Sequence, residues 1–401
     1  MRVLFLADGP RGPLVTGDRL RNWRLVERLA RRHRITWWSL QEPGATDPGP
    51  APAGVEARDV RVPPGWQEPG GKLAKWLRAL TSPEPLLLMP PQLRGVGAEV
   101  ERAAADCDVI HVSHLQAWRA VPPSLHRRCV VDLHDSMSLR YDAFLKASPA
   151  MRFRDRSFFW YSFLGQAEKL RAYERGMPAR AGAAVVVAAR DRDHIGSASM
   201  RVIPNGVDTE YFRHDGGGRV PGRLVFFGNL RYRPNADAAG VLAREVLPAV
   251  RARVPGAHVR LVGADPGPPV QALAGLPGVT LVGWVDDMRE ELSRAEAFAC
   301  PLRVASGLQN KVLEALAMEL PTVASPTAVA GLELRDGTDL RVCPTGEEFA
   351  RVVAELLEDP AARARLADSG RDAVRRAYSW DRAAEAFGEL YQDVAAAGQP
   401  A

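Results

Sequence analysis

Short, largely apolar segments recur along the chain, and those at 3–7 and 183–188 are apolar without interruption. The first series covers 3–7, 35–40, 109–112, 130–133 and 183–188, and the second covers 224–227, 259–262, 279–282, 298–302 and 322–324. Strands that are buried on both faces of a parallel sheet have this pattern. Segments with apolar residues near a 3.6-residue period lie between them, for example at 20–29 and 241–250. The sequence therefore predicts an α/β fold with parallel sheets.

The two series of strands predict two domains, because 401 residues exceed what one ordinary core holds. Pro204 stops the last strand of the first series, and Asn205-Gly206 is strong turn chemistry. A glycine-rich stretch at 214–223 follows before the second series begins. We expect Rossmann-like domains at 1–204 and 205–378, and a C-terminal helix at 379–401 that packs back on the first domain.

The net charge of +5 and the pI near 9.2 allow a nucleotide, an anionic lipid or a nucleic acid as a partner. Arginines interleave with aromatic residues at 153–176, but no RRM, KH or helix-turn-helix pattern accompanies them. A buried helix whose arginines reach the surface explains this segment better than nucleic-acid binding. The basic amphipathic segment KLAKWLRAL at 72–80 is either a core helix or a surface that faces an acceptor or a membrane.

The sequence also gives an expected location and cofactor requirement. The four cysteines form no metal-ligand spacing, which suits a reducing compartment, and no apolar run reaches 18 residues. We expect a cytoplasmic protein, with any contact with the inner membrane being peripheral. No G-x-G-x-x-G dinucleotide fingerprint, P-loop or convincing carboxylate pair for a metal occurs, so neither a cofactor nor a metal is predicted.

Candidate site residues follow strands of both series. The stretch 300–334 reads as a strand end, a glycine loop and a helix that carries Lys311 and Glu314 three residues apart. A cation there suits a diphosphate and a carboxylate suits sugar hydroxyls, while an ordinary βαβ crossover is the alternative. A second glycine loop at 228–235 carries two arginines, and His134-Asp135 follows a strand of the first series. Two facing domains of this kind suggest a nucleotide-diphosphate ligand between them.

Four motifs carry a resemblance to a known family. PNGVDTEYF at 204–212 resembles the hinge signature of GT-B fold glycosyltransferases of the GT4 type, and GLQNKVLEALAMELPTVAS resembles their E-x7-E region. FFGNLRYRPNADAA and TGDRLRNWRLVERLARRH resemble the PEP-CTERM/EpsH (exosortase)-associated sugar transferases. The resemblance implies two Rossmann-like domains that face each other across a cleft, with the acceptor side in the first domain and the nucleotide sugar in the second.

The resemblance also implies roles for particular residues. Glu314 matches the second Glu of E-x7-E, which holds the ribose hydroxyls, and Ser306 stands in place of the first, which touches the transferred sugar. Asn229 and Pro234 replace the usual Arg and Lys of the diphosphate loop, and Glu319 replaces a Gly. The residues expected at the catalytic centre are His134, Asp135, Arg231 and Lys311; those expected to bind the donor are Gly17, Gly228, Asn229, Arg231, Arg233, Trp284, Val285, Ser306, Gly307, Leu308, Lys311 and Glu314.

The expected activity is metal-independent, retaining transfer of a hexose from a nucleotide-diphosphate sugar to an acceptor hydroxyl. Exopolysaccharide or other glycoconjugate synthesis is the expected process, with a glycan, a lipid-linked sugar or a small molecule as acceptor. Two alternatives stay open: a non-catalytic nucleotide-sugar-binding subunit, which Ser306 and the altered loop would suit, and a GT-B sugar-nucleotide epimerase.

Overall fold

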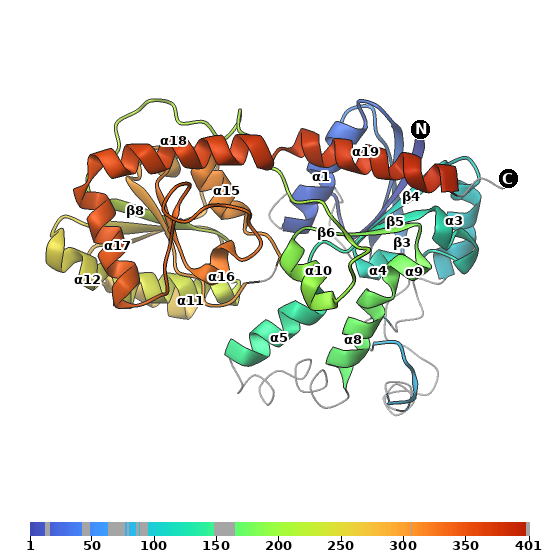
Figure 1. Cartoon of the computed structure of the whole chain (residues 1–401), viewed down its shortest axis with the longest axis horizontal. Helices are drawn as coiled ribbons and strands as arrows, with labels where there is room; N and C mark the ends of the chain where they lie inside the picture. The colour runs from blue at the N-terminus through green and yellow to red at the C-terminus, as the bar shows by residue number, and fades with distance from the viewer. Residues whose placement is uncertain are drawn as a thin grey trace. The chain divides into compact units, whose positions relative to one another are not determined.

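The computed structural model describes residues 1–12, 17–41, 49–62, 77, 80–85, 88, 95–147, 165–305 and 307–397. The chain divides into two compact units, one formed by Met1–Pro204 with Trp380–Ala401 and the other by Asn205–Ser379 (Figure 1). Most of the amphipathic segment at 72–80, the first half of the expected helix at 153–176, and Ser306 lie outside the described residues.

The first unit is built on a parallel sheet with the strand order β3-β2-β1-β4-β5-β6-β7 among its described residues. The order reverses between β1 and β4, and this reversal is where an open α/β sheet leaves a crevice at its carboxyl edge. The strands are β1(Arg2–Asp8), β2(Arg34–Gln41), β3(Glu56–Arg61), β4(Val109–Ser113), β5(Cys129–Asp132), β6(Ala183–Val186) and β7(Arg201–Val202). The helices are α1(Gly17–Leu29), α3(Gly97–Ala104), α4(Leu115–Trp118), η3(Pro123–Arg128), α5(Met137–Ala147), α8(Gln166–Arg175), α9(Met177–Arg180), α10(Ala189–Ile195) and α19(Trp380–Ala397).

Both faces of this sheet are covered, as its largely apolar central strands predict. Along β1, Leu4 and Leu6 point into one core cluster while Val3 and Phe5 point into the other, because successive side chains of a strand alternate. The second cluster contains α1 and the C-terminal helix α19, which pack against each other (Figure 1). Tyr391 of α19 is fully buried there, and its hydroxyl lies 2.7 Å from Nδ1 of His111 on β4.

Strand β3 is absent from the strands that the sequence predicted for the first series. It pairs in parallel with β2 at the edge of the sheet. Val60 is its one buried residue, and the other five are exposed. Without an apolar run or a clear alternation, the segment has no signal that marks it as a strand.

The second unit contains a parallel sheet with the order β10-β9-β8-β11-β12-β13 among its described residues, and the order reverses between β8 and β11. The strands are β8(Arg223–Phe227), β9(His258–Val262), β10(Val279–Gly283), β11(Ala297–Cys300), β12(Thr322–Ala324) and β13(Arg341–Val342). The helices are α11(Arg233–Val241), η4(Leu242–Val246), α12(Leu247–Arg253), α13(Pro268–Gln271), η5(Ala272–Gly275), α14(Met288–Arg294), α15(Asn310–Ala317), α16(Pro326–Val329), α17(Glu347–Glu358) and α18(Pro360–Ala377). The predicted α/β fold with two parallel sheets is confirmed.

Candidate functional site

Three neighbouring strands of the second unit run into glycines at the carboxyl edge of the sheet. Gly228, Gly263 and Gly283 have φ of 146°, 149° and 81°, which L side chains rarely adopt. A Cβ on Gly263 would lie 1.8 Å from the carbonyl oxygen of Gly228, so the two backbones approach too closely for any side chain. The backbone at the end of β8 is therefore held in place by packing, next to the reversal in strand order.

Lys311, in the first turn of α15, reaches this point. Its Nζ donates a hydrogen bond to Oδ1 of Asn235 and lies 5.2 Å from the centre of the Phe226 ring. A Cβ on Gly228 would lie 3.1 Å from Nζ, so the missing side chain makes room for the ammonium group. Burial lowers the pKa of Lys311, and the nearby Cys300 and Glu314 oppose that shift. The arrangement places a partly buried cation at the edge of the sheet.

Asn235 completes this arrangement, and the sequence analysis did not identify it. Its Nδ2 donates to the carbonyl oxygen of Asn229 at 2.9 Å, while its Oδ1 accepts from Lys311. Asn229 in turn accepts a hydrogen bond from the backbone N–H of Arg231 at 2.9 Å through its Oδ1. The only sequence signal for Asn235 is a polar amide in the first turn of the helix that follows a glycine loop.

Glu314 lies one turn beyond Lys311 on the same helix. Burial raises its pKa to about 7, although Lys311 acts in the opposite direction. Its carboxylate makes no hydrogen bond or ion pair with any residue that the structure describes. A carboxylate held in a protein interior without such partners is costly, so Glu314 is available to hydrogen-bond a ligand.

The other predicted donor residues of this unit lie at varied positions. The Arg231 side chain is exposed, and Arg233 is the first residue of α11. Trp284 follows the edge strand β10, is 62% exposed, and lies within 3.3 Å of Asp286 through Nε1, with Val285 between them. Gly307 has φ of 59°, and Leu308 is buried; Ser306 before them is outside the described residues. The structure thus brings together Gly228, Asn229, Asn235 and Lys311, whereas no described contact joins Trp284 to them.

In the first unit, His134 lies just after β5, beside the reversal in strand order. Ser113 at the end of β4 donates to Oδ1 of Asn22 at 2.6 Å, and His134 Nε2 lies 3.0 Å from the Ser113 hydroxyl. Since Ser113 has only one proton to donate, the contact requires a proton on Nε2 and leaves a lone pair on Nδ1. Burial lowers the pKa of His134 to about 4, against the opposing effect of Asp132, so the ring is neutral at pH 7.

His134 and His114 both have backbone conformations that are unusual for residues other than glycine. Their φ values are 63° and 74°, and their rings meet edge to face with centroids 5.6 Å apart. Such conformations cost about 1–3 kcal/mol each and gather at functional sites. Asp135 is partly buried, and one of its oxygens lies 3.8 Å from Arg140. The predicted His134-Asp135 pair therefore sits in a strained turn at the carboxyl edge of this sheet.

Gly17 is the first residue of α1 and is exposed. A Cβ on Gly17 would meet no described atom within 4 Å, and its φ is not in the left-handed region. Nothing in the described part of the chain thus requires a glycine at this position.

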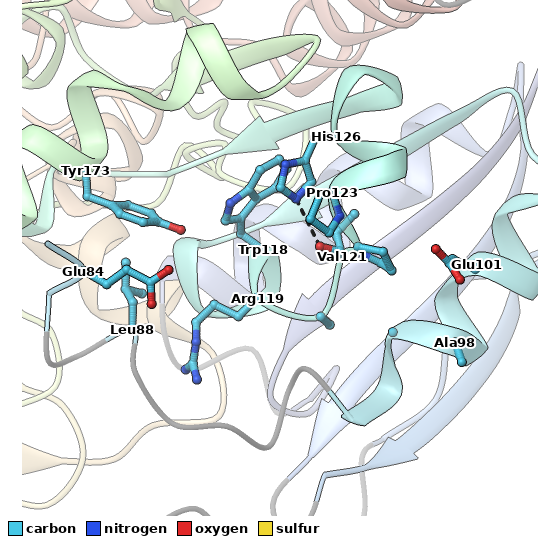
Figure 2. A pocket seen from close by; sticks show the side chains of 13 residues that line it. Glu84, Leu88, Ala98, Glu101, Trp118, Arg119, Val121, Pro123, His126 and Tyr173 are labelled. Atoms are coloured by element: carbon cyan, nitrogen blue, oxygen red, sulfur yellow. Dashed lines mark hydrogen bonds between the residues drawn. The ribbon is translucent and has the colours of Figure 1, made fainter. Parts of the chain in front are cut away.

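A separate cavity of about 560 Å³ lies in the first unit among α3, α4, η3 and α8. In Figure 2 the side chains of Tyr173 and Trp118 point toward one another, and Trp118 packs on His126 with ring centroids 4.0 Å apart. Glu84 and Glu101 also line it. None of the predicted site residues lines this cavity, so it is separate from the candidate site at the carboxyl edges of the sheets.

Two further features bear on the chemistry. No three His, Cys, Asp or Glu side chains in the described ranges lie together as a metal site would require. No described helix is long and apolar enough to cross a membrane.

Comparisons with known proteins agree with this architecture. The family model described as Glycosyltransferase Family 4 matches residues 21–211, and the model described as Glycosyl transferases group 1 matches residues 221–359. A GDP-mannose-dependent alpha-(1-6)-phosphatidylinositol monomannoside mannosyltransferase of Mycobacterium tuberculosis is 30% identical over 210 residues, which are 46% of this chain and 54% of the relative. The chain thus spans about half the length of this curated relative.

Solved structures share the fold of the whole chain. Sucrose-phosphate synthase from Thermosynechococcus elongatus has a TM-score of 0.70 at 18% identity, covering 99% of this chain and all of the other. Anabaena HepE in complex with UDP and glucose has a TM-score of 0.64 at 15% identity, covering 97% and 99%. Both structures have low sequence identity to this chain, so they show the fold alone. The solved structures give the chain a GT-B fold, and the two family models, which together match most of it, show that it belongs to the glycosyltransferases.

Proposed function

We propose that this protein transfers a hexose from a nucleotide-diphosphate sugar to an acceptor hydroxyl, with retention at the anomeric carbon and without a metal. The proposal includes a cytoplasmic location, a role in polysaccharide or glycoconjugate synthesis, and a glycan, lipid-linked sugar or small molecule as acceptor. The subgroup is proposed to be that of the PEP-CTERM/EpsH-associated sugar transferases.

The placement of Lys311 beside Gly228, with Glu314 one turn further along the same helix, is the observation that supports this proposal most. Negative charge grows on the β-phosphate as the nucleoside diphosphate leaves, and a fixed cation stabilises it without reorganisation. Lys311 is held by Asn235 at the start of α15, where unpaired backbone N–H groups add partial positive charge. Glu314, one turn away and free of described partners, is placed to accept hydrogen bonds from vicinal ribose hydroxyls. HepE holds UDP, and the mycobacterial relative depends on GDP-mannose, so a nucleotide-diphosphate donor is consistent with both.

His134 supplies the proposed acceptor-side group. It is neutral at pH 7, and its Nδ1 lone pair is available to accept a hydrogen bond from the acceptor hydroxyl. The acceptor hydroxyl then turns its proton from His134 to the departing phosphate oxygen, which takes it as the acceptor oxygen attacks the anomeric carbon on the face from which the diphosphate leaves. In this mechanism no enzyme nucleophile is needed, and the protein contributes positioning and charge stabilisation.

Donor binding and transfer test the proposal in turn. The purified protein is screened with UDP-, GDP-, ADP- and dTDP-sugars by thermal shift and then by calorimetry. We expect one donor to bind and Lys311→Met to weaken its affinity by about 10- to 100-fold, since a charge-assisted hydrogen bond contributes about 1.5–3 kcal/mol. The matched control is Arg365→Met, which removes an exposed cation on α18 and should leave affinity unchanged.

Product analysis with the donor so identified follows. Transfer to an acceptor, with retained anomeric configuration by NMR, supports the proposed reaction. Binding with neither transfer nor hydrolysis favours the non-catalytic subunit, and formation of an epimer without acceptor favours the epimerase. Failure of every nucleotide sugar to bind, or wild-type affinity in Lys311→Met, overturns the proposal.

A further inference from the structure

Glu174 of α8 is a fully buried carboxylate that the proposed mechanism does not use. Its Oε1 accepts hydrogen bonds from the backbone N–H groups of Met137 at 2.7 Å and Ser138 at 3.3 Å. Its Oε2 accepts from the hydroxyls of Ser136 at 3.0 Å and Ser138 at 2.6 Å. The side chain of Glu174, from a helix that is distant in sequence, thus accepts from two backbone N–H groups in the first turn of α5.

A second buried carboxylate holds the residue before that turn. Asp191, in the first turn of α10, is 1% exposed, and its Oδ1 accepts from the backbone N–H of Ser136 at 2.8 Å. Its Oδ2 is buried and has no hydrogen-bond partner among the described residues. Two acidic side chains from two helices therefore accept from three consecutive backbone N–H groups, those of Ser136, Met137 and Ser138.

The segment that they hold contains His134. The His134 backbone has φ of 63°; its N–H donates to Oδ1 of Asp132 at 3.2 Å, and its carbonyl oxygen accepts from Val187 N–H at 2.8 Å. The next fixed points along the chain are Ser136 and Met137, and both depend on Asp191 and Glu174. A left-handed conformation in a residue with a side chain persists only where the surroundings determine it.

We propose that Glu174 and Asp191 are positioning residues that hold the 134–138 turn, and with it the His134 ring and the Asp135 carboxylate, in the geometry needed for the acceptor. The consequence for catalysis rests on the proposed function, whereas the effect on the turn does not. Neither residue contacts the His134 ring in the described structure, so each acts through the backbone.

The protonation of Glu174 and Asp191 indicates which substitutions preserve their hydrogen bonds to the turn. Burial raises the pKa of both carboxyls to about 7, and hydrogen bonds from Ser136 oppose the shift in each. The charged groups that face the pair are Asp135 and Arg190, with Arg140 beside Asp135. Protonated Glu174 can keep Oε1 for the two backbone N–H groups, while its Oε2 donates to a serine hydroxyl and the hydroxyls rotate. Glutamine has the same shape and the same donor at that position, so Glu174→Gln reproduces the protonated form.

The first test measures the turn itself by hydrogen–deuterium exchange of the peptide covering 134–140. We expect this peptide to exchange about tenfold faster or more in Glu174→Ala and Asp191→Ala, since the backbone N–H groups of 136–138 lose their acceptors. Glu174→Gln and Asp191→Asn keep an acceptor oxygen and should retain wild-type protection. Glu168→Ala, an exposed site on the same helix, is the matched control. Unchanged exchange in both alanine variants overturns the proposal.

The second test measures transfer with the donor and acceptor found for the wild type. We expect kcat to fall about tenfold or more in Glu174→Ala, because small misplacements of catalytic groups are costly, with the donor KM within about twofold of wild type. Glu174→Gln should restore kcat. If Glu174→Ala does not fold, Asp191→Ala against Asp191→Asn provides the same comparison. If the alanine variants exchange faster but the wild type transfers no sugar, the proposed function is wrong and the role of the two carboxylates in holding the turn stays supported. Faster exchange with unchanged kcat overturns the catalytic consequence.

Discussion

Replacing Arg21 by alanine should destabilise the first unit more than any other single loss of a charge on α1. The Arg21 guanidinium is 1% exposed; its Nε lies 2.7 Å from Oδ2 of Asp132, and its Nη2 donates to the carbonyl oxygen of Ile203 at 3.0 Å. Asp132 is fully buried, so the substitution leaves a carboxylate in the interior without its cation. Breaking a buried pair in this way costs about 3–5 kcal/mol.

Part of that cost can be worked from the pKa of Asp132. Burial alone would raise it, but Arg21, followed by His134, lowers it from 3.8 to about 2. A depression of this size corresponds to about 2 kcal/mol of stability, present above pH 3.8 and lost as the pH falls toward 2. The lost hydrogen bond to Ile203 and the space left by the side chain supply the remainder.

Urea unfolding at pH 8 and pH 4.5 measures the effect, with Arg24→Ala as the control. Arg24 pairs with Glu27 at 3.4 Å on the outer part of the same helix, and an i,i+3 pair of this kind contributes about 0.2–0.5 kcal/mol. In Arg21→Ala the buried Asp132 should bind a proton in the folded state, so the deficit should be largest at pH 8 and smaller at pH 4.5. Equal losses in the two variants, or a deficit that grows as the pH falls, would show that Arg21 does not stabilise the buried Asp132 carboxylate.

Three other predictions follow from single contacts. Glu314→Gln should remove a pH dependence of the free energy of unfolding. Because the pKa of Glu314 is raised in the folded state, the wild type loses stability as the pH rises from about 4.5 to 7, by at most about 3 kcal/mol. Denaturation at pH 5 and pH 8 compares the two proteins. Gly263→Ala should cost more than about 3 kcal/mol or prevent folding, whereas Gly283→Ala, with open space around it, should cost only about 1–2 kcal/mol in thermal unfolding. Tyr391→Phe should cost about 1–2 kcal/mol by the same measurement, because His111, whose Nε2 has no described partner, would lose the bond at Nδ1 as well.

The fold class was predictable because the signal lies in local composition. Strands that are covered on both faces carry apolar side chains on both, and β1, β5, β8 and β11 show this in the sequence. Strand β3 was missed because an exposed edge strand needs no such run. A backbone position also agrees with the sequence: Glu319 stands where the related family usually has a glycine. The structure gives it φ of 55°, and the Arg219 guanidinium bonds its carbonyl oxygen at 2.7 Å.

The site was predictable only in its local part. Lys311 and Glu314 could be paired because helical spacing places them on one face. Asn235 could not be identified, since its contact with Lys311 depends on how two helices dock at the end of β8. The buried pair of Glu174 and Asp191 was invisible for the same reason: both carboxylates meet the 134–138 turn from helices that are distant in sequence.

The energetics of Glu314 separate a ligand-directed residue from a structural one. Asp132 is fully buried in its own unit, but Arg21 and the His134 N–H satisfy it, and its pKa falls to about 2. Among the residues that the structure describes, Lys311 is the one charged group that acts on Glu314, whose pKa rises to about 7, so its ionised form opposes folding at neutral pH. A glutamine of the same shape would avoid that cost, and stability alone therefore gives no reason for a carboxylate at this position. A ligand that donates two hydrogen bonds does give one, because it would bring the pKa of Glu314 back down when it binds. Nucleotide binding should therefore release a proton near pH 7 in wild type and none in Glu314→Gln, which calorimetry in buffers of different ionisation enthalpy measures directly.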